Sequence, residues 1–293
     1  MNLEHFGMDT ITLAGALEAK LAAIRSAGFT QVMLSAADLV GHERGERAAI
    51  EAVRASGLEA TGFQVLRDFE GLSGHLHAYK VDIAKAMLES CRALGAPLLL
   101  ACSSTSAHAA GDPRLLAKDL AKLAMLAVPL GIRIAYEALS WGRHVNLLAQ
   151  AREIVETADH PNLGLCIDSY HMLANRTGMD AVDDIDPAKI FLVQLSDFMW
   201  REIRTPEDRI ETARHYRVFP GEGLHSEAIA DLARKLDGRG YRGDYSFEVF
   251  NDDYRQISPA VVAGRARRSA KWITDLVARR SLPARGRGQP ATR

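Results

Sequence analysis

Cysteine is scarce in this 293-residue chain, and its scarcity narrows the classes of protein to consider. The three cysteines, Cys91, Cys102 and Cys166, lie inside apolar helix-like or strand-like runs and lack paired spacing. That placement argues against a disulfide framework and predicts buried free thiols, which are typical of a reducing compartment. We therefore expect a cytoplasmic protein.

Two further absences concern membranes and nucleic acids. The sequence has no apolar run of about 18 residues and no positively charged leader followed by an apolar stretch, so we expect neither a membrane span nor secretion. The formal net charge is −1, whereas a nucleic-acid binder usually carries a clear basic excess. Residues 279–293 are the exception to this even charge balance. They are rich in Arg, Gly and Pro, and we expect a disordered basic tail there.

Strand-like and helix-like segments alternate along residues 1–278. The strand-like runs lie near residues 2–7, 30–35, 58–65, 97–102, 132–137, 163–168, 190–195 and 244–248. Amphipathic stretches separate most of them, and Asp112-Pro113 provides a cap and a first-turn proline for a helix over 114–129. Eight such units predict a single (β/α)₈ TIM barrel of the α/β class. A doubly wound open sheet would need a phosphate-binding glycine fingerprint after the first strand, and none is present.

Oxygen-bearing side chains end four of the predicted strands. IAYE ends in Glu137, LGLCID in Asp168, FLVQ in Gln194 and YSFE in Glu248. In a parallel barrel the carboxyl ends of neighbouring strands meet at one face, so three carboxylates and an amide would gather there. Such a set needs a compensating cation, and oxygen ligands suit a hard divalent ion. We predict a metal site for Mg²⁺, Mn²⁺ or Co²⁺, with Zn²⁺ also compatible.

Each acid taken alone has a structural explanation, because Asp and Glu commonly cap the following helix. The joint pattern on four consecutive strands favours a metal site instead. His171 lies three residues after Asp168, where the chain leaves the strand, so its imidazole could reach the same face. Proton transfer near pH 7 favours imidazole, and we predict a catalytic or supporting role for it.

Two long connections, 64–77 and 196–223, are predicted to form the rim of the site. Arg67 and Arg217 lie on them, and either guanidinium could bind a substrate carboxylate or phosphate through two hydrogen bonds. The alternative is a surface ion pair with Asp68 or Glu222. After the fifth strand, two further side chains could face the pocket, Trp141 as a wall and His144 as a substrate contact. Trp141 could equally seal the core, and His144 could brace its loop.

Over residues 1 to about 278 the sequence resembles the xylose isomerase-like TIM barrels of the sugar phosphate isomerase/epimerase superfamily. That resemblance places the family's metal ligands on Glu137, Asp168, Gln194 and Glu248. Within the superfamily, several stretches are similar to bacterial 3-dehydroshikimate dehydratases: LRDFEG (66–71), AYEALSWGRHVN (135–146), LCIDSYH (165–171), RHYRVFPGEG (214–223) and FEVFNDDYRQ (247–256).

The resemblance implies a metal-dependent lyase that converts 3-dehydroshikimate to protocatechuate through a stabilised enolate. Arg67 and Arg217 would then lie near the substrate carboxylate or hydroxyls, and His171 near the reacting carbon. One alternative is a keto-sugar isomerase or epimerase, or an inosose-type dehydratase, in which Glu137 and Glu248 would act as acid and base. Abasic-site DNA cleavage needs more histidine ligands than are present, and a non-catalytic barrel would keep the acids only as caps. The expected partner is a small molecule, with no nucleic acid or membrane, and a homo-oligomer is compatible with the sequence.

Overall fold

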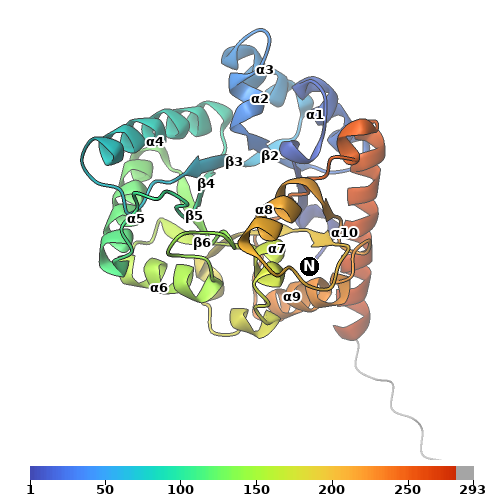
Figure 1. The fold of residues 1–293 in the computed structure, drawn as a ribbon. Helices are drawn as coiled ribbons and strands as arrows, with labels where there is room; N and C mark the ends of the chain where they lie inside the picture. The colour runs from blue at the N-terminus through green and yellow to red at the C-terminus, as the bar shows by residue number, and fades with distance from the viewer. Residues whose placement is uncertain (282–293) are drawn as a thin grey trace, which may run out of the picture.

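Eight parallel strands close into a barrel in the computed structural model, which describes residues 1–281 (Figure 1). The strands follow the order β1-β10-β7-β6-β5-β4-β3-β2 around the barrel. Their bounds are β1 Phe6–Asp9, β2 Gln31–Ser35, β3 Glu59–Arg67, β4 Leu98–Cys102, β5 Arg133–Glu137, β6 Leu163–Asp168, β7 Ile190–Leu195 and β10 Tyr245–Phe247. The predicted (β/α)₈ architecture is therefore confirmed.

Helices surround the strands and bury their apolar faces against them (Figure 1). The α-helices are α1 Leu17–Ser26, α2 Ala36–Val40, α3 Glu46–Ser56, α4 Gly74–Leu94, α5 Pro113–Ala127, α6 Leu148–Ala158, α7 Ser169–Ala174, α8 Pro206–His215, α9 Ser226–Gly238 and α10 Pro259–Ser281. As predicted, Asp112 caps α5 by accepting a hydrogen bond from the Arg114 N–H, and Pro113 occupies the first turn. No helix within residues 1–281 is long and apolar enough to cross a membrane.

The barrel interior is apolar along most of its length. Inward side chains form a packed cluster that includes Met33, Leu98, Leu100, Phe191 and Leu192. This cluster fills the barrel so that polar side chains can face open space only at its carboxyl end. All three cysteines are buried and free, as expected.

Two predicted boundaries were wrong, and a third, the end of the domain, stays a prediction. The first strand was expected at 2–7 but lies at Phe6–Asp9, after a short 3₁₀ helix at Leu3–His5. The predicted rim loop 64–77 is mostly regular structure, because β3 continues to Arg67 and α4 begins at Gly74. Helix α10 continues to Ser281, beyond the predicted domain end at 278, and the rest of the predicted tail lies outside the described residues.

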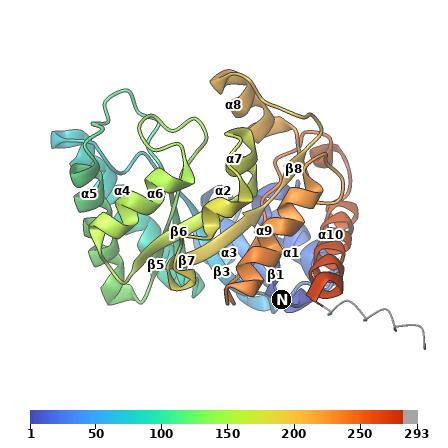
Figure 2. The same cartoon turned by 90° about the horizontal axis from the view of Figure 1, so that it is seen from below.

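The predicted loop 196–223 is also largely structured. It contains α8 between two short strands, β8 Asp197–Phe198 and β9 Arg217–Val218, which pair antiparallel. Thr205 caps α8 through a reciprocal pair of hydrogen bonds with Asp208. In Figure 2 the helix stands above the barrel beside α7. The insertion is thus an ordered element that can hold side chains over the barrel mouth.

Candidate active site at the barrel mouth

The strand register brings one polar or thiol side chain from each strand to the carboxyl end of the barrel. Paired residues of parallel strands share a face, and so do residues two apart on one strand. Cys102 pairs with Glu137, Asp168 with Gln194, and Ser35 with Gln64. Continuing this register around the barrel gives an inward ring at its mouth: Asp9, Ser35, Gln64, Cys102, Glu137, Asp168, Gln194 and Glu248. The four predicted metal ligands are the half of this ring on β5, β6 and β7 and directly after β10.

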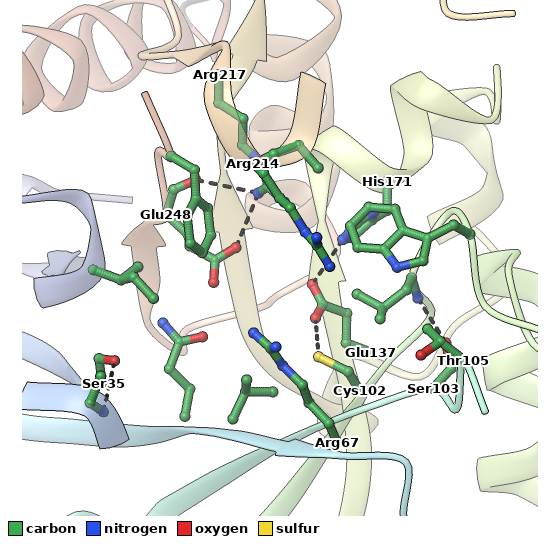
Figure 3. Close-up of a pocket in the computed structure, with 18 of the residues that line it drawn as sticks. Ser35, Arg67, Cys102, Ser103, Thr105, Glu137, His171, Arg214, Arg217 and Glu248 are labelled. Atoms are coloured by element: carbon green, nitrogen blue, oxygen red, sulfur yellow. Dashed lines mark hydrogen bonds and ion pairs between the residues drawn. The ribbon is translucent and has the colours of Figure 1, made fainter. Parts of the chain in front are cut away.

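A cavity of about 700 Å³ opens above the ring. Glu137, Glu248 and His171 lie on its floor side, while Arg67 and Arg214 extend into it from the rim (Figure 3). A space of this size accommodates a small organic substrate. Of the predicted site residues, six line this pocket: Arg67, Glu137, Trp141, His171, Arg217 and Glu248.

Glu137, Asp168 and His171 form a compact buried cluster. Each offers one donor atom, and these three atoms lie within 4.8 Å of one another. Glu137 Oε1 and His171 Nε2 are buried without a hydrogen-bond partner. Buried polar atoms without partners are uncommon in native proteins, so atoms left free at the same place fit an absent ligand. The carboxylates of this cluster can accommodate a metal ion.

Gln194 is fully buried beside the cluster. Its Oε1 accepts a hydrogen bond from the Cys166 thiol at 3.3 Å, and its Nε2 has no partner. A half-turn of the amide exchanges the two atoms, so that Nε2 would face the sulfur and Oε1 would take the unpartnered position. In that arrangement Gln194 offers the oxygen donor that the sequence predicted.

Without a cation, it is electrostatically unfavourable for Glu137, Asp168 and Glu248 all to be ionised. Burial raises the pKa of Glu137 well above its usual value, and the charges of Asp168 and Glu248 raise it further. Burial also raises the pKa of Asp168, against the opposing effect of Arg217. The pKa of Glu248 is raised to about 7, chiefly by burial, although Arg217 opposes the shift. A bound dication would allow all three groups to ionise.

Arg217 is an internal counter-ion for two of these acids. Its Nη1 donates to Asp168 Oδ2 at 2.8 Å and to Glu248 Oε2 at 3.0 Å, while its guanidinium lies 4.4 Å from the centre of the Tyr170 ring. The side chain is only 2% exposed. The predicted alternative, a surface ion pair with Asp68 or Glu222, was wrong because this guanidinium turns into the barrel.

His171 is held by Ser140. The Ser140 backbone N–H donates to His171 Nδ1 at 3.1 Å, so Nδ1 carries no proton and the neutral ring carries it on Nε2. That Nε2 lies 3.6 Å from Asp168 Oδ2 and 3.7 Å from Glu137 Oε1. Burial, followed by the charge of Arg217, lowers the pKa of His171 well below its usual value, which keeps the ring neutral. The geometry gives His171 an N–H directed at the acids, and such a nitrogen cannot ligate a metal without a change of tautomer.

Comparisons with known proteins agree with this geometry. A model of the xylose isomerase-like TIM barrel family matches residues 21–276. The chain belongs to this family. It is 39% identical over 266 residues to a 3-dehydroshikimate dehydratase of Pseudomonas aeruginosa and 37% identical over 266 residues to one of Pseudomonas putida. Each alignment covers 91% of this chain and 41% of the relative.

A solved structure is similar over nearly the whole chain. A xylose isomerase-like TIM barrel/4-hydroxyphenylpyruvate dioxygenase fusion protein superposes with a TM-score of 0.87 at 35% identity, covering 97% of this chain and 45% of that one. The chain thus spans less than half the length of these relatives. The predicted resemblance to the dehydratases is confirmed.

Some of the predicted substrate contacts line the cavity and one does not. Arg67 and Trp141 line the cavity, and the Trp141 ring meets the His171 ring edge-on with their centres 5.1 Å apart. His144 does not line it. Its Nε2 instead lies 2.8 Å from the Ala109 carbonyl oxygen, a placement that favours the bracing role over substrate contact.

Four members of the ring were not predicted as site residues: Asp9, Ser35, Gln64 and Cys102. Asp9 is completely buried, and its Oδ2 has no partner. The sequence did not identify Asp9 because the predicted first strand, 2–7, ends two residues before it. Gln64 lines the cavity within β3. Cys102 is the buried free thiol that was predicted, and it also has a partner in the site. Its thiol donates a hydrogen bond to Glu137 Oε2 at 2.8 Å, which leaves Glu137 Oε1 free to face the cluster.

Proposed function

We propose that this barrel is a divalent-metal-dependent lyase that dehydrates 3-dehydroshikimate to protocatechuate. The observation that carries the proposal is the buried cluster of Glu137, Asp168 and His171 beside the cavity, in which Glu137 Oε1 and His171 Nε2 have no hydrogen-bond partner. The Pseudomonas relatives named 3-dehydroshikimate dehydratase support the substrate.

Glu137, Asp168, Gln194 and Glu248 are the residues that would hold the ion. Their oxygen donors suit Mg²⁺, Mn²⁺ or Co²⁺, and Zn²⁺ also accepts carboxylate ligands. When bound, the ion supplies positive charge that stabilises the negative oxygen developing on a ketone substrate. Cys102 would orient Glu137, and Arg217 would hold Asp168 and Glu248 close together in the absence of the ion.

The reaction removes one water molecule by β-elimination. A base takes the proton on the carbon next to the ketone, the bond from the β-carbon to its hydroxyl oxygen breaks, and that oxygen leaves as water after gaining a proton. Loss of a further C–H proton to solvent, with protonation of the ketone oxygen, gives the aromatic diol. His171 lines the cavity with its Nε2–H, and we assign it to donate a hydrogen bond to the leaving hydroxyl. Glu248 also lines the cavity, and we assign it to take the proton from the carbon next to the ketone and to pass it to the leaving hydroxyl.

The test is to incubate the purified protein with 3-dehydroshikimate and follow the absorbance of the catechol product. We expect product formation with Mn²⁺, its loss after chelation, and recovery with Mg²⁺, Mn²⁺ or Co²⁺. Asp168→Asn should lose at least about 100-fold in kcat/KM, whereas Asp82→Asn, on the exposed face of α4, should behave as wild type. A wild type that makes no catechol but changes the configuration of a keto-sugar without loss of water would replace the lyase by the epimerase. Full activity without metal would exclude the assigned role of the ion.

A further inference from the structure

Unpaired guanidinium groups mark the rim of the cavity. Arg67, Arg214 and Arg255 all line it, and none of the three side chains makes a hydrogen bond or ion pair within residues 1–281. By contrast, Arg217 is fully engaged with the acids below. Guanidinium groups recognise planar anions through paired hydrogen bonds, so an unpaired one aimed into a pocket is available to an anionic ligand.

Arg214 is held over the pocket by an anchored helix. It lies in the last turn of α8, and Tyr170 Oη donates to the Arg209 carbonyl of the same helix at 2.6 Å. Arg209 in turn donates through Nη1 to the Ser140 carbonyl at 3.0 Å. Beyond the helix, Tyr216 forms an antiparallel bridge with Asn251. These contacts fix the backbone that carries Arg214.

The cavity therefore has opposite charges at its two ends. Its floor holds the acids, which would bind a cation, and its rim carries Arg67 and Arg214, which both point into the space (Figure 3). Arg67 is near enough to Glu248 to lower the pKa of that carboxyl, whereas the Arg214 guanidinium is exposed and approaches from the opposite wall. A ligand that fits both ends carries an oxygen for the cation at one end and an anionic group at the other.

We propose that Arg214, together with Arg67, binds the carboxylate of the substrate and selects acidic ring ketones over neutral sugars and cyclitols. This inference rests on the proposed function, because it assigns the acidic end of that substrate. A neutral keto-sugar or inosose has no group to pair with these guanidiniums, so it would gain nothing from them. Arg214 is accordingly a specificity-determining residue supplied by the insertion rather than by the barrel.

The experiment compares Arg214→Gln and Arg214→Lys with a matched control, Arg204→Gln. Arg204 belongs to the same insertion but pairs with Glu202 and does not line the cavity. We expect Arg214→Gln to raise KM for 3-dehydroshikimate about 10- to 100-fold with kcat within about threefold, since charge-assisted hydrogen bonds contribute about that factor. Arg214→Lys should recover part of the loss, and Arg204→Gln should match the wild type.

Two inhibitors separate a carboxylate contact from a general effect on the pocket. Protocatechuate and catechol share the aromatic diol and differ in the carboxylate. Arg214→Gln should weaken inhibition by protocatechuate by the same factor as KM and leave inhibition by catechol unchanged. Equal weakening of both inhibitors, wild-type behaviour of Arg214→Gln, or a loss confined to Arg255→Gln would each overturn the inference while leaving the lyase in place. A wild type without dehydratase activity would overturn both.

Discussion

Removing the metal should make this protein less stable as the pH rises, because its floor acids are buried. The pKa of Glu248 is raised from the usual 4.5 to about 7. The folded state therefore holds this proton more tightly than the unfolded state does. The contribution of Glu248 to the free energy of unfolding is complete below about pH 4.5 and is lost as the pH rises through about 7.

The magnitude follows from the shift. A difference of about 2.5 pKa units at about 1.4 kcal/mol per unit gives a loss of about 3–4 kcal/mol for Glu248 alone. Glu137 and Asp168 shift in the same direction and add to it. At about 2 °C per kcal/mol for a domain of this size, Glu248 should lower the melting temperature by about 5 °C between pH 5 and 8, whereas the lowered pKa of His171 acts in the opposite direction.

Differential scanning calorimetry in chelator at pH 5, 6, 7 and 8 measures this loss, and Glu248→Gln is the matched control. The variant cannot ionise at position 248, so its melting temperature should depend less steeply on pH than that of the wild type. Saturating Mn²⁺ should reverse the loss at pH 8, by about 2.7 kcal/mol at 100 times its dissociation constant. Identical pH profiles for wild type and variant in chelator would refute the assignment of a buried, proton-binding Glu248.

Three further substitutions test single contacts of the floor. His171→Ala should lower kcat about 10²- to 10⁴-fold, as measured by steady-state kinetics, because it removes a positioned hydrogen-bond donor; an effect on KM alone would make His171 a binding residue. Arg217→Met should destabilise the metal-free protein by about 3–5 kcal/mol in urea unfolding, since Asp168 and Glu248 lose their counter-ion, and Mn²⁺ should restore part of that loss. Cys102→Ala should weaken Mn²⁺ binding several-fold by calorimetry, because Glu137 loses a hydrogen bond, and unchanged affinity would remove the positioning role.

Most of the fold was predictable because the strands are short apolar runs with clear ends. The runs ending in Glu137, Asp168 and Gln194 were placed within about one residue of the observed strands. Prediction failed where local signals compete. Residues 2–7 begin with a 3₁₀ turn capped by Asn2, so the strand starts later than its apolar pattern indicates. The α8 region is rich in charge and reads as loop, although its Thr205 cap and Pro206 are helix-start signals that could have identified it.

The candidate site was only half visible in the sequence. Acids at strand ends signal a cation site, and the pattern located that half of the ring. The partners of those acids carry no such signal. Arg217 looked like any rim arginine, and its turn into the barrel depends on a strand pairing across the insertion that no local pattern encodes. The thiol of Cys102 likewise acquires its partner only through the register of β4 and β5.

The division of the ring between two sets of strands has a consequence for altering which ligands this cavity accepts. Asp9, Ser35 and Gln64 are the ring positions on β1, β2 and β3. These strands do not carry the predicted metal-binding acids. Libraries diversified at Ser35 could therefore remodel the cavity wall without replacing any of these acids. Gln64 is a less independent position, because it lies close enough to Glu248 to lower the pKa of that carboxyl.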